Sequence, residues 1–337
     1  MKIANLLGPR NLVIEDWPLD TSKLGPNDLW GETEISGFKI GTDRGNYEGA
    51  EDVPGAPTYP RWVGDSNLAV IKGVGSAVTR FKVGDRVVSR QPHQSEWVTD
   101  QHGAIVKVPE GVDSEDAIWA HLYTLSGLCY RKANFVPGEY VAVVGLGVLG
   151  LGAIGLGPGM GARTIGIGNS PLRNEMAMKM GAHATFLYDD PDLQAKLDEY
   201  TNGNGIDLVI LTANPWPAYR TSVEIVRDNG RVAIVSLLGR GEEPADFNPL
   251  AMKYFYHKSI SLIAVNGTAP YQYPQSNADR LSWNKQCEFV LQLMADGSLK
   301  PSQIITHRLH YSRMKEAYEM AYNREKTMLG VTFQWTD

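Results

Sequence analysis

The pattern of hydrophobic and polar positions changes near residue 110. Before that point, short segments rich in β-branched residues are separated by Gly, Pro and Asp, as in ETEISGF, NLAVIKGVG, DRVVSR and GAIVKVP. Such short alternating segments between turn residues are typical of β-strands. The first 110 residues are therefore predicted to form a β-rich region.

From about residue 112, apolar strands alternate with segments of helical length. The strands YVAVV, TIGIGN, DLVILTA and RVAIVSL are spaced by stretches such as PLRNEMAMKMGA and TSVEIVRDNG. This alternation is typical of βαβ units around a parallel sheet. The C-terminal part adds a helix (KQCEFVLQLMADG), a strand (ITHRLHY), a second helix (SRMKEAYEMAYN) and a last strand (LGVTFQW). An α/β fold with two domains follows, since 337 residues exceed the usual size of one domain.

Composition and charge exclude several classes of protein. Hydrophobic residues make up 43% of the chain and charged residues 21%, which is ordinary for a globular protein. The net charge of −6 and the scattered Lys and Arg residues argue against nucleic acid or an anionic membrane as a partner. No apolar stretch approaches the ~20 residues that a membrane span needs, so we expect a cytoplasmic protein. Cys129 and Cys287 are too few for a disulfide framework or a four-thiolate zinc site.

The strongest motif is a glycine-rich turn directly after the strand YVAVV. Gly145, Gly147 and Gly150 fit the pattern GxGxxG, with Val148 and Leu149 between the last two glycines. In a strand–turn–helix context these glycines allow a tight turn, a close approach to a pyrophosphate and close helix packing. The motif therefore predicts a dinucleotide site, although a glycine-rich packing turn without a ligand has the same pattern. Pro158 in the following segment is expected to kink or end the helix.

The end of the second strand bears on the choice between NADP(H) and NAD(H). Enzymes that use NAD(H) normally place a carboxylate there for the ribose hydroxyls, whereas this chain has Gly168, Asn169 and Ser170 followed by Arg173. Without the acid a 2′-phosphate is not repelled, and these side chains offer donors and a positive charge, so NADP(H) is favoured over NAD(H). Alternatively, Ser170 only caps the helix that begins at Pro171, and Arg173 is solvated. Thr124 and Leu237 complete the candidate cofactor contacts.

Several segments together resemble the medium-chain dehydrogenase/reductase superfamily. They are SGFKIGTD, GVGSAVTRFKVGDRVV, VPEGV, FVPGEYVAVVGLGVLG and the closing helix and strand. The resemblance implies a Rossmann domain at 122–265 inserted into a GroES-like, β-rich substrate domain made of 1–121 and 266–337. It also implies an active site in the cleft between the domains, and a homodimer or homotetramer that associates through the edge strand around 259–265.

The positions that bind the catalytic zinc in this superfamily are altered. By the resemblance, Ile40 stands where a Cys ligand would be and Asp65 where a His ligand would be, and only His121 falls near the third position. One His does not make a site that usually needs three protein ligands, so no zinc is expected. The chain looks most like a zinc-lacking branch that includes bacteriochlorophyllide hydroxyethyl dehydrogenases.

A zinc-free site needs another group to stabilise the negative charge that develops on the substrate oxygen. The candidates are Lys39, Asp65, His93, His121 and Tyr123. His titrates near neutral pH and Tyr donates without ionising, and we choose His121 as the proton donor with Asp65 as its orienting partner. Each of these residues is also compatible with a structural role.

The aromatic residues are more numerous than a minimal core requires. Several lie in segments expected to border the cleft, either as substrate contacts or as core: Trp62, Trp97, Trp119, Tyr123, Trp216, Tyr271, Tyr273 and Trp283.

The sequence thus predicts a zinc-independent oxidoreductase that interconverts an alcohol and a carbonyl with NADP(H). Two alternatives remain open at this stage. One is reduction of an activated C=C bond, as in enoyl and quinone reductases of the same superfamily. The other is a non-catalytic NADPH-binding protein, because a fold alone does not establish a function.

Overall fold

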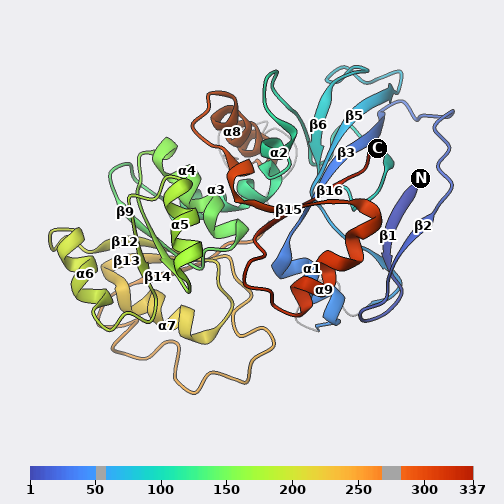
Figure 1. Cartoon of the computed structure of the whole chain (residues 1–337). Coiled ribbons are helices and arrows are strands. Elements are labelled where there is room, and N and C mark those ends of the chain that lie inside the picture. The colour runs from blue at the N-terminus through green and yellow to red at the C-terminus, as the bar shows by residue number, and fades with distance from the viewer. Residues whose placement is uncertain (51–57, 268–281, 337) are drawn as a thin grey trace. The chain divides into compact units, whose positions relative to one another are not determined.

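The computed structural model describes residues 1–50, 58–267 and 282–336. The chain forms two compact units, and the fold is α/β (Figure 1). The first unit contains the described parts of Met1–His121, Ala269–Gly297 and Ile304–Asp337, and the second contains Leu122–Thr268 and Ser298–Gln303. In this division the first segment of the first unit ends at His121, which lies in the helix α3 (Ala120–Lys132).

The first unit is built mainly from antiparallel sheet. A seven-stranded sheet has the order β15-β16-β3-β5-β6-β8, with β7 paired to β3, and a small sheet has the order β2-β1-β4. The strands are β1 (Lys2–Leu6), β2 (Leu12–Asp16), β3 (Asp28–Phe38), β4 (Arg61–Trp62), β5 (Asn67–Val74), β6 (Arg86–Ser89), β7 (Glu96–Asp100), β8 (Ile105–Lys107), β15 (Ile305–His310) and β16 (Gly330–Gln334). The helices are α1 (Ile40–Glu48), α2 (Ser114–Ala117), α8 (Trp283–Ala295) and α9 (Met314–Tyr322), and the 3₁₀ turns are η1 (Pro301–Ile304), which lies across the boundary with the second unit, and η2 (Tyr311–Arg313).

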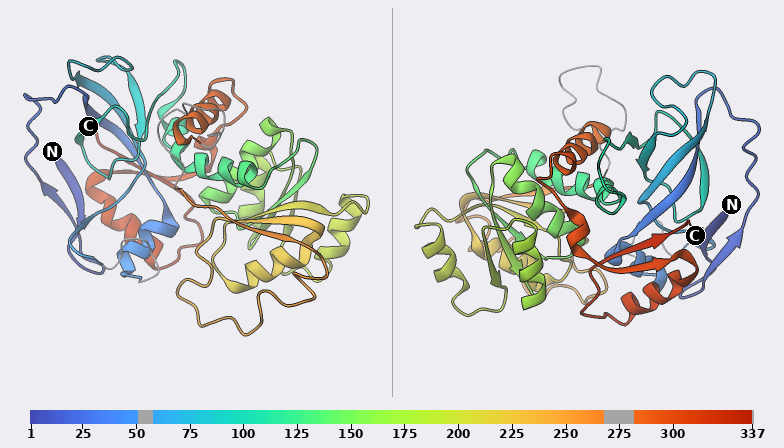
Figure 2. Two further views of the ribbon diagram at one scale, coloured as in Figure 1. Left: turned by 180° about the vertical axis from the view of Figure 1, so that it is seen from behind. Right: turned by 45° about the horizontal axis from the view of Figure 1, so that its top comes forward.

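Two segments that are far apart in the sequence form one core of this unit. The helix α9 lies beside α1, as both views in Figure 2 show. Phe38, Tyr47 and Tyr318 pack their rings against one another, with centroids 4.8 Å and 5.2 Å apart for the two contacts of Tyr318. The C-terminal helix and strands therefore complete the β-rich domain that begins at the N-terminus.

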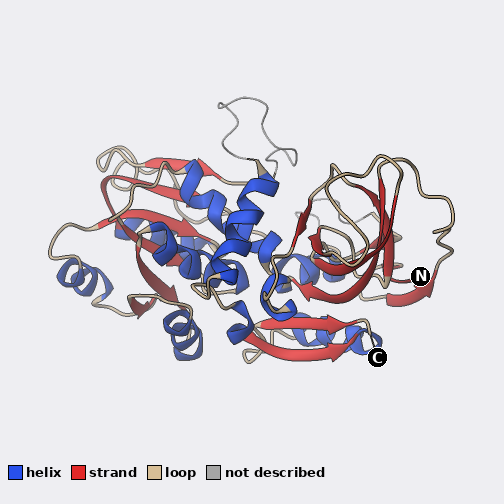
Figure 3. Cartoon of the chain, turned by 90° about the horizontal axis from the view of Figure 1, so that it is seen from above, coloured by secondary structure: helices blue, strands red, loops and turns tan. Residues whose placement is uncertain are grey.

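The second unit is a parallel sheet of six strands with the order β11-β10-β9-β12-β13-β14. Its strands are β9 (Tyr140–Val144), β10 (Arg163–Gly168), β11 (Ala184–Leu187), β12 (Ile206–Leu211), β13 (Val226–Ile234) and β14 (Ser261–Ala264). The helices α4 (Val148–Met160) and α5 (Pro171–Lys179) contact one another and the strands β9 to β11, and Figure 3 shows helices flanking this sheet. The helices α6 (Leu193–Tyr200) and α7 (Trp216–Ile225) pack into the core formed with β9, β10, β12 and β13. This strand order is that of the Rossmann fold, in which ligands bind at the carboxyl ends of the strands.

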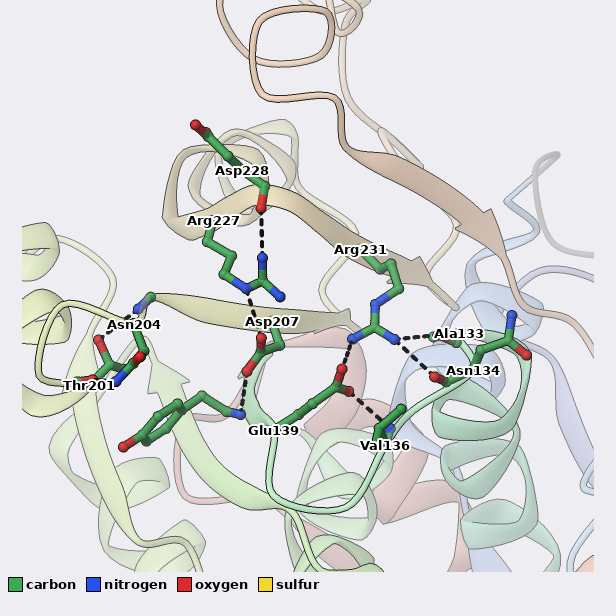
Figure 4. A network of polar contacts seen from close by, with 12 residues as sticks. Ala133, Asn134, Val136, Glu139, Thr201, Asn204, Asp207, Arg227, Asp228 and Arg231 are labelled. Carbon is green, nitrogen blue, oxygen red and sulfur yellow. Dashed lines mark hydrogen bonds and ion pairs between the residues drawn. The ribbon is translucent and has the colours of Figure 1, made fainter.

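The amino ends of these strands are held by charged side chains. Arg231 donates to the carbonyls of Ala133 and Asn134, at 2.9 Å each, and to Glu139 (Figure 4). Asp207 accepts from Arg227 at 2.7 Å and from the backbone N–H of Tyr140 at 2.8 Å. This network ties β9, β12 and β13 together at the edge opposite the glycine-rich turn, so its role is structural.

The helix α4 differs from expectation at Pro158. The helix continues through this residue to Met160 and ends at Gly161, whose φ of 84° forms a left-handed cap. Proline removes the hydrogen bond that its N–H would donate to the carbonyl four residues earlier and clashes with the preceding turn, but here only two further residues follow before the helix ends. Among the described residues, no helix is long and apolar enough to cross a membrane.

Candidate functional site

The glycine-rich turn joins β9 to α4 and leaves the backbone open. Gly145 has a φ of 99°, which favours glycine, and a Cβ at Gly150 would overlap the carbonyl oxygen of Gly145. Gly147 is the N-cap of α4, and a Cβ there would meet no atom within 4 Å. Gly145 and Gly150 are therefore required by the turn itself, whereas the space at Gly147 is available to a ligand. An open helix N-terminus at this position suits a pyrophosphate.

Neighbouring side chains hold this turn in place. Thr212 Oγ1 donates to the carbonyl of Gly145 at 2.6 Å, and Arg173 Nη1 donates to the carbonyl of Leu146 at 2.9 Å. Arg173 is half-buried, and burial lowers its pKa, so it is not simply solvated. The guanidinium that the sequence assigns to a 2′-phosphate thus already lies beside the turn.

The end of β10 has the geometry of a helix start. Ser170 caps α5 and accepts a hydrogen bond from the N–H of Arg173 at 3.4 Å, and Asn169 is exposed. A Cβ at Gly168 would overlap Oδ1 of Asn174, so the Asn174 side chain occupies the space that the missing carboxylate would take. Asn174 gave no signal in the sequence, because its proximity to Gly168 depends on how α5 packs on β10.

The remaining candidate cofactor residues are dispersed. Val148 is buried in the first turn of α4, and Leu149 offers its carbonyl to Ser126 Oγ at 2.7 Å. Thr124 is buried in α3 and Leu237, after β13, is 39% exposed. Tyr123 is fully buried, and its ring packs against α4 at Gly152, where any Cβ would overlap it. Tyr123 belongs to the second unit and the other catalytic candidates to the first, because the division between the units falls within α3 directly after His121.

In the first unit, Asp65 is the centre of a cluster of charges. It forms ion pairs with Lys39 and with Arg90, the latter at 3.3 Å. Burial acts to raise the pKa of Asp65, but the two cations outweigh it and hold the pKa below its usual value. Asp65 is therefore a carboxylate whose charge is already used by two partners.

Asp43 lies next to this cluster and has the opposite property. It accepts hydrogen bonds from the N–H of Lys39 at 2.8 Å and from the Tyr318 hydroxyl at 3.2 Å. Burial, and then the charge of Asp65, raise the pKa of Asp43 to about 7. The site thus contains one ionised and one partly protonated carboxyl group near neutral pH.

His93 is completely buried between strands. Its Nδ1 lies 2.8 Å from Ser36 Oγ, which also accepts from the Trp335 indole at 2.8 Å. The imidazole packs over Gly64, where a Cβ would come within 2.6 Å of the ring. Burial lowers the pKa of His93 to about 3, so the ring is neutral.

His121 is also buried, with 2% of its surface exposed. The Trp283 indole N–H donates to His121 Nδ1 at 2.7 Å. Burial lowers the pKa of His121 to about 3, against the smaller opposite effect of the Val88 carbonyl. The sequence suggests that His121 ionises near neutral pH. In the structure the ring is neutral at that pH instead, because the fold excludes water from it. Trp283, rather than Asp65, orients the ring through Nδ1.

The residues at this site do not fit a zinc ion. Ile40 offers no ligand atom, and Asp65 is the counterion of two cations, which would have to be displaced by a metal. Over the described ranges, no group of three or more His, Cys, Asp or Glu side chains is arranged to hold a metal.

The structure brings together Lys39, Asp65, His93 and His121, since each of these histidines is influenced by the charges of Lys39 and Asp65. Sequence reasoning missed Arg90, for which no signal existed. It noted Trp283 only as one of many aromatics and predicted that the next helix begins after it, whereas Trp283 is the first residue of α8. Tyr271 and Tyr273 lie outside the described residues.

The comparisons relate the chain to dehydrogenases, some of which are named as zinc-binding. Residues 148–283, less than half of the chain, match the family model of the zinc-binding dehydrogenases. Sorbitol dehydrogenase of Halalkalibacterium halodurans is 23% identical over 324 residues, which cover 87% of this chain and 88% of that protein. An uncharacterized zinc-type alcohol dehydrogenase-like protein of Escherichia coli is 25% identical over 244 residues, which cover 69% of this chain and 61% of that protein. A 2-haloacrylate reductase from Burkholderia is 30% identical over 158 residues, or 44% of this chain and 47% of that protein.

Solved structures show the same fold. Galactitol-1-phosphate dehydrogenase from Escherichia coli has a TM-score of 0.82 at 18% identity, covering 99% of this chain and 100% of that one. An alcohol dehydrogenase from Escherichia coli in complex with NADH has a TM-score of 0.78 at 19% identity, with 99% of both chains covered. A zinc-binding dehydrogenase from Sinorhizobium meliloti bound to NADP has a TM-score of 0.76 at 18% identity, covering 99% and 98%.

The matched family model and the dehydrogenase relatives indicate an oxidoreductase, and the solved structures show its fold. The solved structures share the arrangement of a parallel Rossmann-like sheet and a separate domain rich in antiparallel sheet, which is the fold that the sequence predicted.

Proposed function

We propose that this protein interconverts an alcohol and a carbonyl with NADP(H) and without zinc. The observation that carries the proposal is the ion cluster at Asp65. Lys39 and Arg90 pair with the carboxylate of Asp65, which by the resemblance stands at a zinc-ligand position, and in this proposal the charges of the cluster take the place of the metal. A charged, partly buried cluster of this kind is the environment expected near a reacting polar group.

The cofactor would be held by the glycine-rich turn of the second unit. Gly147 leaves room for the pyrophosphate, and the N-terminus of α4 favours its charge. Gly168 removes the carboxylate that repels a 2′-phosphate, and Arg173 and Ser170 lie beside that position. When bound, the cofactor supplies or accepts the hydride. These features support NADP(H) over NAD(H).

The protein's own residues would then stabilise the substrate oxygen. His121 is the first choice, as a neutral hydrogen-bond donor rather than as an acid that ionises near pH 7. Lys39 adds a positive charge nearby, and Asp65 and Arg90 fix its position. The proton that completes the alcohol comes from solvent in this scheme, because His121 does not hold a second proton at neutral pH.

A second function is favoured by one observation. The 30% identity to a 2-haloacrylate reductase over 158 residues makes reduction of an activated C=C bond the main alternative. The two reactions are separated by their products, since an enone gives an allylic alcohol in one case and a saturated ketone in the other.

The test combines metal analysis with turnover. We expect less than about one tenth of a zinc ion per chain, unchanged activity after chelation, and oxidation of NADPH with aldehydes or ketones. About one zinc per chain with activity lost on chelation contradicts the proposal. Tight NADPH binding without turnover over carbonyls, alcohols and enones would instead identify a non-catalytic binding protein.

We also propose that the protein is a homodimer or homotetramer that associates through β14. This strand is the last one in the order of the six-stranded sheet. An unpaired strand edge is a template for pairing with another chain. Sedimentation of the purified protein tests this, and a monomer at micromolar concentration contradicts it.

A further inference from the structure

The two buried histidines of the first unit differ in what their Nδ1 atoms contact. His121 Nδ1 accepts from an indole N–H, and His93 Nδ1 contacts a serine hydroxyl. An indole N–H only donates, whereas a hydroxyl both donates and accepts. Trp283 therefore determines the protonation of His121 Nδ1, whereas Ser36 leaves both neutral forms of His93 available.

The geometry of the Trp283–His121 contact is that of a strong hydrogen bond. The two ring planes differ by 14°, the ring centroids are 6.2 Å apart and the two nitrogens are 2.7 Å apart. The rings thus lie side by side, so the indole N–H points at the lone pair in the plane of the imidazole. A nitrogen that accepts in this way carries no proton, and the proton of the neutral ring must be on Nε2.

The surroundings keep His121 in this neutral form. Both rings are buried, with 2% of His121 and 3% of Trp283 exposed. Arg90 lies over the Trp283 ring at 5.2 Å from its centroid, and its charge and that of Lys39 disfavour a positive imidazole. Asp65 acts in the other direction but is shared by these two cations.

The Nε2 atom of His121 is buried, and no partner within the described part of the chain meets it in good hydrogen-bond geometry, although the Val88 carbonyl lies close enough to act as a weak acceptor and to raise the pKa of the ring. A buried donor without a well-placed acceptor costs up to about 1–3 kcal/mol, so its retention calls for an explanation. A neutral imidazole can polarise a carbonyl as a hydrogen-bond donor. We propose that Trp283 is a positioning residue that holds His121 in the Nε2-protonated form and thereby presents this N–H to the substrate oxygen.

This inference rests on the proposed carbonyl–alcohol chemistry, but its first test does not need a substrate. The full-length protein is labelled with ¹⁵N in the histidine rings, and the His121 signals are identified by their loss in His121→Gln. The coupling pattern of the ring nitrogens distinguishes the two neutral forms. We expect pure Nε2–H for His121 from pH 5 to 8, and a mixture of forms in Trp283→Phe. Trp335→Phe is the matched control, since it removes an indole N–H next to His93 and should leave the His121 signals unchanged.

The second test uses turnover of a carbonyl substrate by NADPH. Trp283→Phe should lower kcat about tenfold, the value of one hydrogen bond of ~1.4 kcal/mol, with the KM for NADPH unchanged. His121→Gln places an amide N–H near the position of Nε2 and should retain more activity than His121→Asn, which places it near Nδ1. Removal of the donor in the Asn variant should lower kcat by about 10²-fold. This pair keeps the proposal testable if Trp283→Phe does not fold.

The outcomes separate this inference from the proposed function. An Nδ1–H form in the unmodified protein, or a pure Nε2–H form in Trp283→Phe, overturns the role of Trp283 whatever the activity. Equal activity of the Gln and Asn variants overturns the role of Nε2–H. If the ring nitrogens behave as expected but no carbonyl is reduced, the hydrogen-bond assignment stands and the donation to a substrate oxygen is overturned together with the proposed function.

Discussion

The buried ionisable groups of the first unit predict how its stability depends on pH. His93 and His121 have pKa values lowered to about 3 by burial, whereas a histidine in the unfolded chain titrates near 6.5. Below pH 6.5 the unfolded chain therefore binds protons that the folded chain does not. The free energy of unfolding therefore decreases as the pH falls below about 6.5, because proton uptake by these histidines favours the unfolded chain.

Asp43 has the opposite effect over nearly the same range. Its pKa is raised from 3.8 to about 7, so between these values the folded chain binds a proton that the unfolded chain does not. This term increases stability as the pH falls. Asp65, with its lowered pKa, contributes stability that is lost only below its unfolded value of 3.8.

The magnitudes follow from the linkage between protonation and folding. From pH 7 to pH 5, each histidine should cost about 2 kcal/mol and Asp43 should return about 2 kcal/mol. The free energy of unfolding should therefore fall by about 2 kcal/mol in the unmodified protein. It should fall by about 4 kcal/mol in Asp43→Asn and change little in His121→Asn.

Urea unfolding at pH 7 and pH 5 measures these differences. Tryptophan fluorescence reports on the first unit, because every tryptophan except Trp216 belongs to it. The absolute stability of each variant is not the readout, only its change between the two pH values. The reasoning is refuted if Asp43→Asn shows the same pH dependence as the unmodified protein. It is also refuted if His121→Asn loses as much stability between pH 7 and pH 5 as the unmodified protein does.

Three further outcomes are expected. Gly168→Asp should weaken NADPH binding by about 1–3 kcal/mol in calorimetric titration, because it returns a negative charge beside the 2′-phosphate; wild-type affinity higher for NADH than for NADPH contradicts this. Gly147→Ala should unfold like the unmodified protein, since its Cβ meets no neighbour, but should bind NADPH at least about tenfold more weakly because the methyl group takes up the space for the pyrophosphate. Gly150→Ala should instead lose about 1–3 kcal/mol of stability, because its Cβ would overlap a backbone carbonyl. Asp65→Asn should lower the free energy of unfolding by about 1–3 kcal/mol at pH 7, since two cations lose their counterion, and an unchanged unfolding midpoint argues against the ion cluster.

The elements that the sequence predicted well are those defined by local patterns. The turn from Gly145 to Gly150 follows β9 and opens α4, and the predicted C-terminal strands correspond to β15 and β16. The helix α1 was not expected in a region of strand patterns, because IGTDRGNYE is polar and rich in Gly. Its position is stabilised from outside, through the packing of Tyr47 on Tyr318.

The candidate site shows where sequence reasoning stops. Lys39 and Asp65 were selected one by one from positions in a family pattern, and the fold joins them into an ion pair. Arg90 and Trp283 complete the cluster from segments nearly 200 residues apart, and no local pattern relates them. The protonation of His121 was misjudged because the pKa of an imidazole depends on burial, which the sequence does not show.

The glycines of α4 have a consequence for how this protein can change. Gly152, Gly155 and Gly157 lie under the Tyr123 ring, the Leu299 methyl group and the Thr164 methyl group, and a Cβ at each position would overlap these neighbours. Replacing a helical glycine by alanine usually strengthens a helix. A Cβ at Gly152 would overlap the Tyr123 ring, and a Cβ at Gly157 would overlap Thr164 and Tyr130, so this common route to a more thermostable variant is closed at these two positions. Selection for heat resistance would have to act at other positions, and these two glycines would persist in the helix beside the dinucleotide turn.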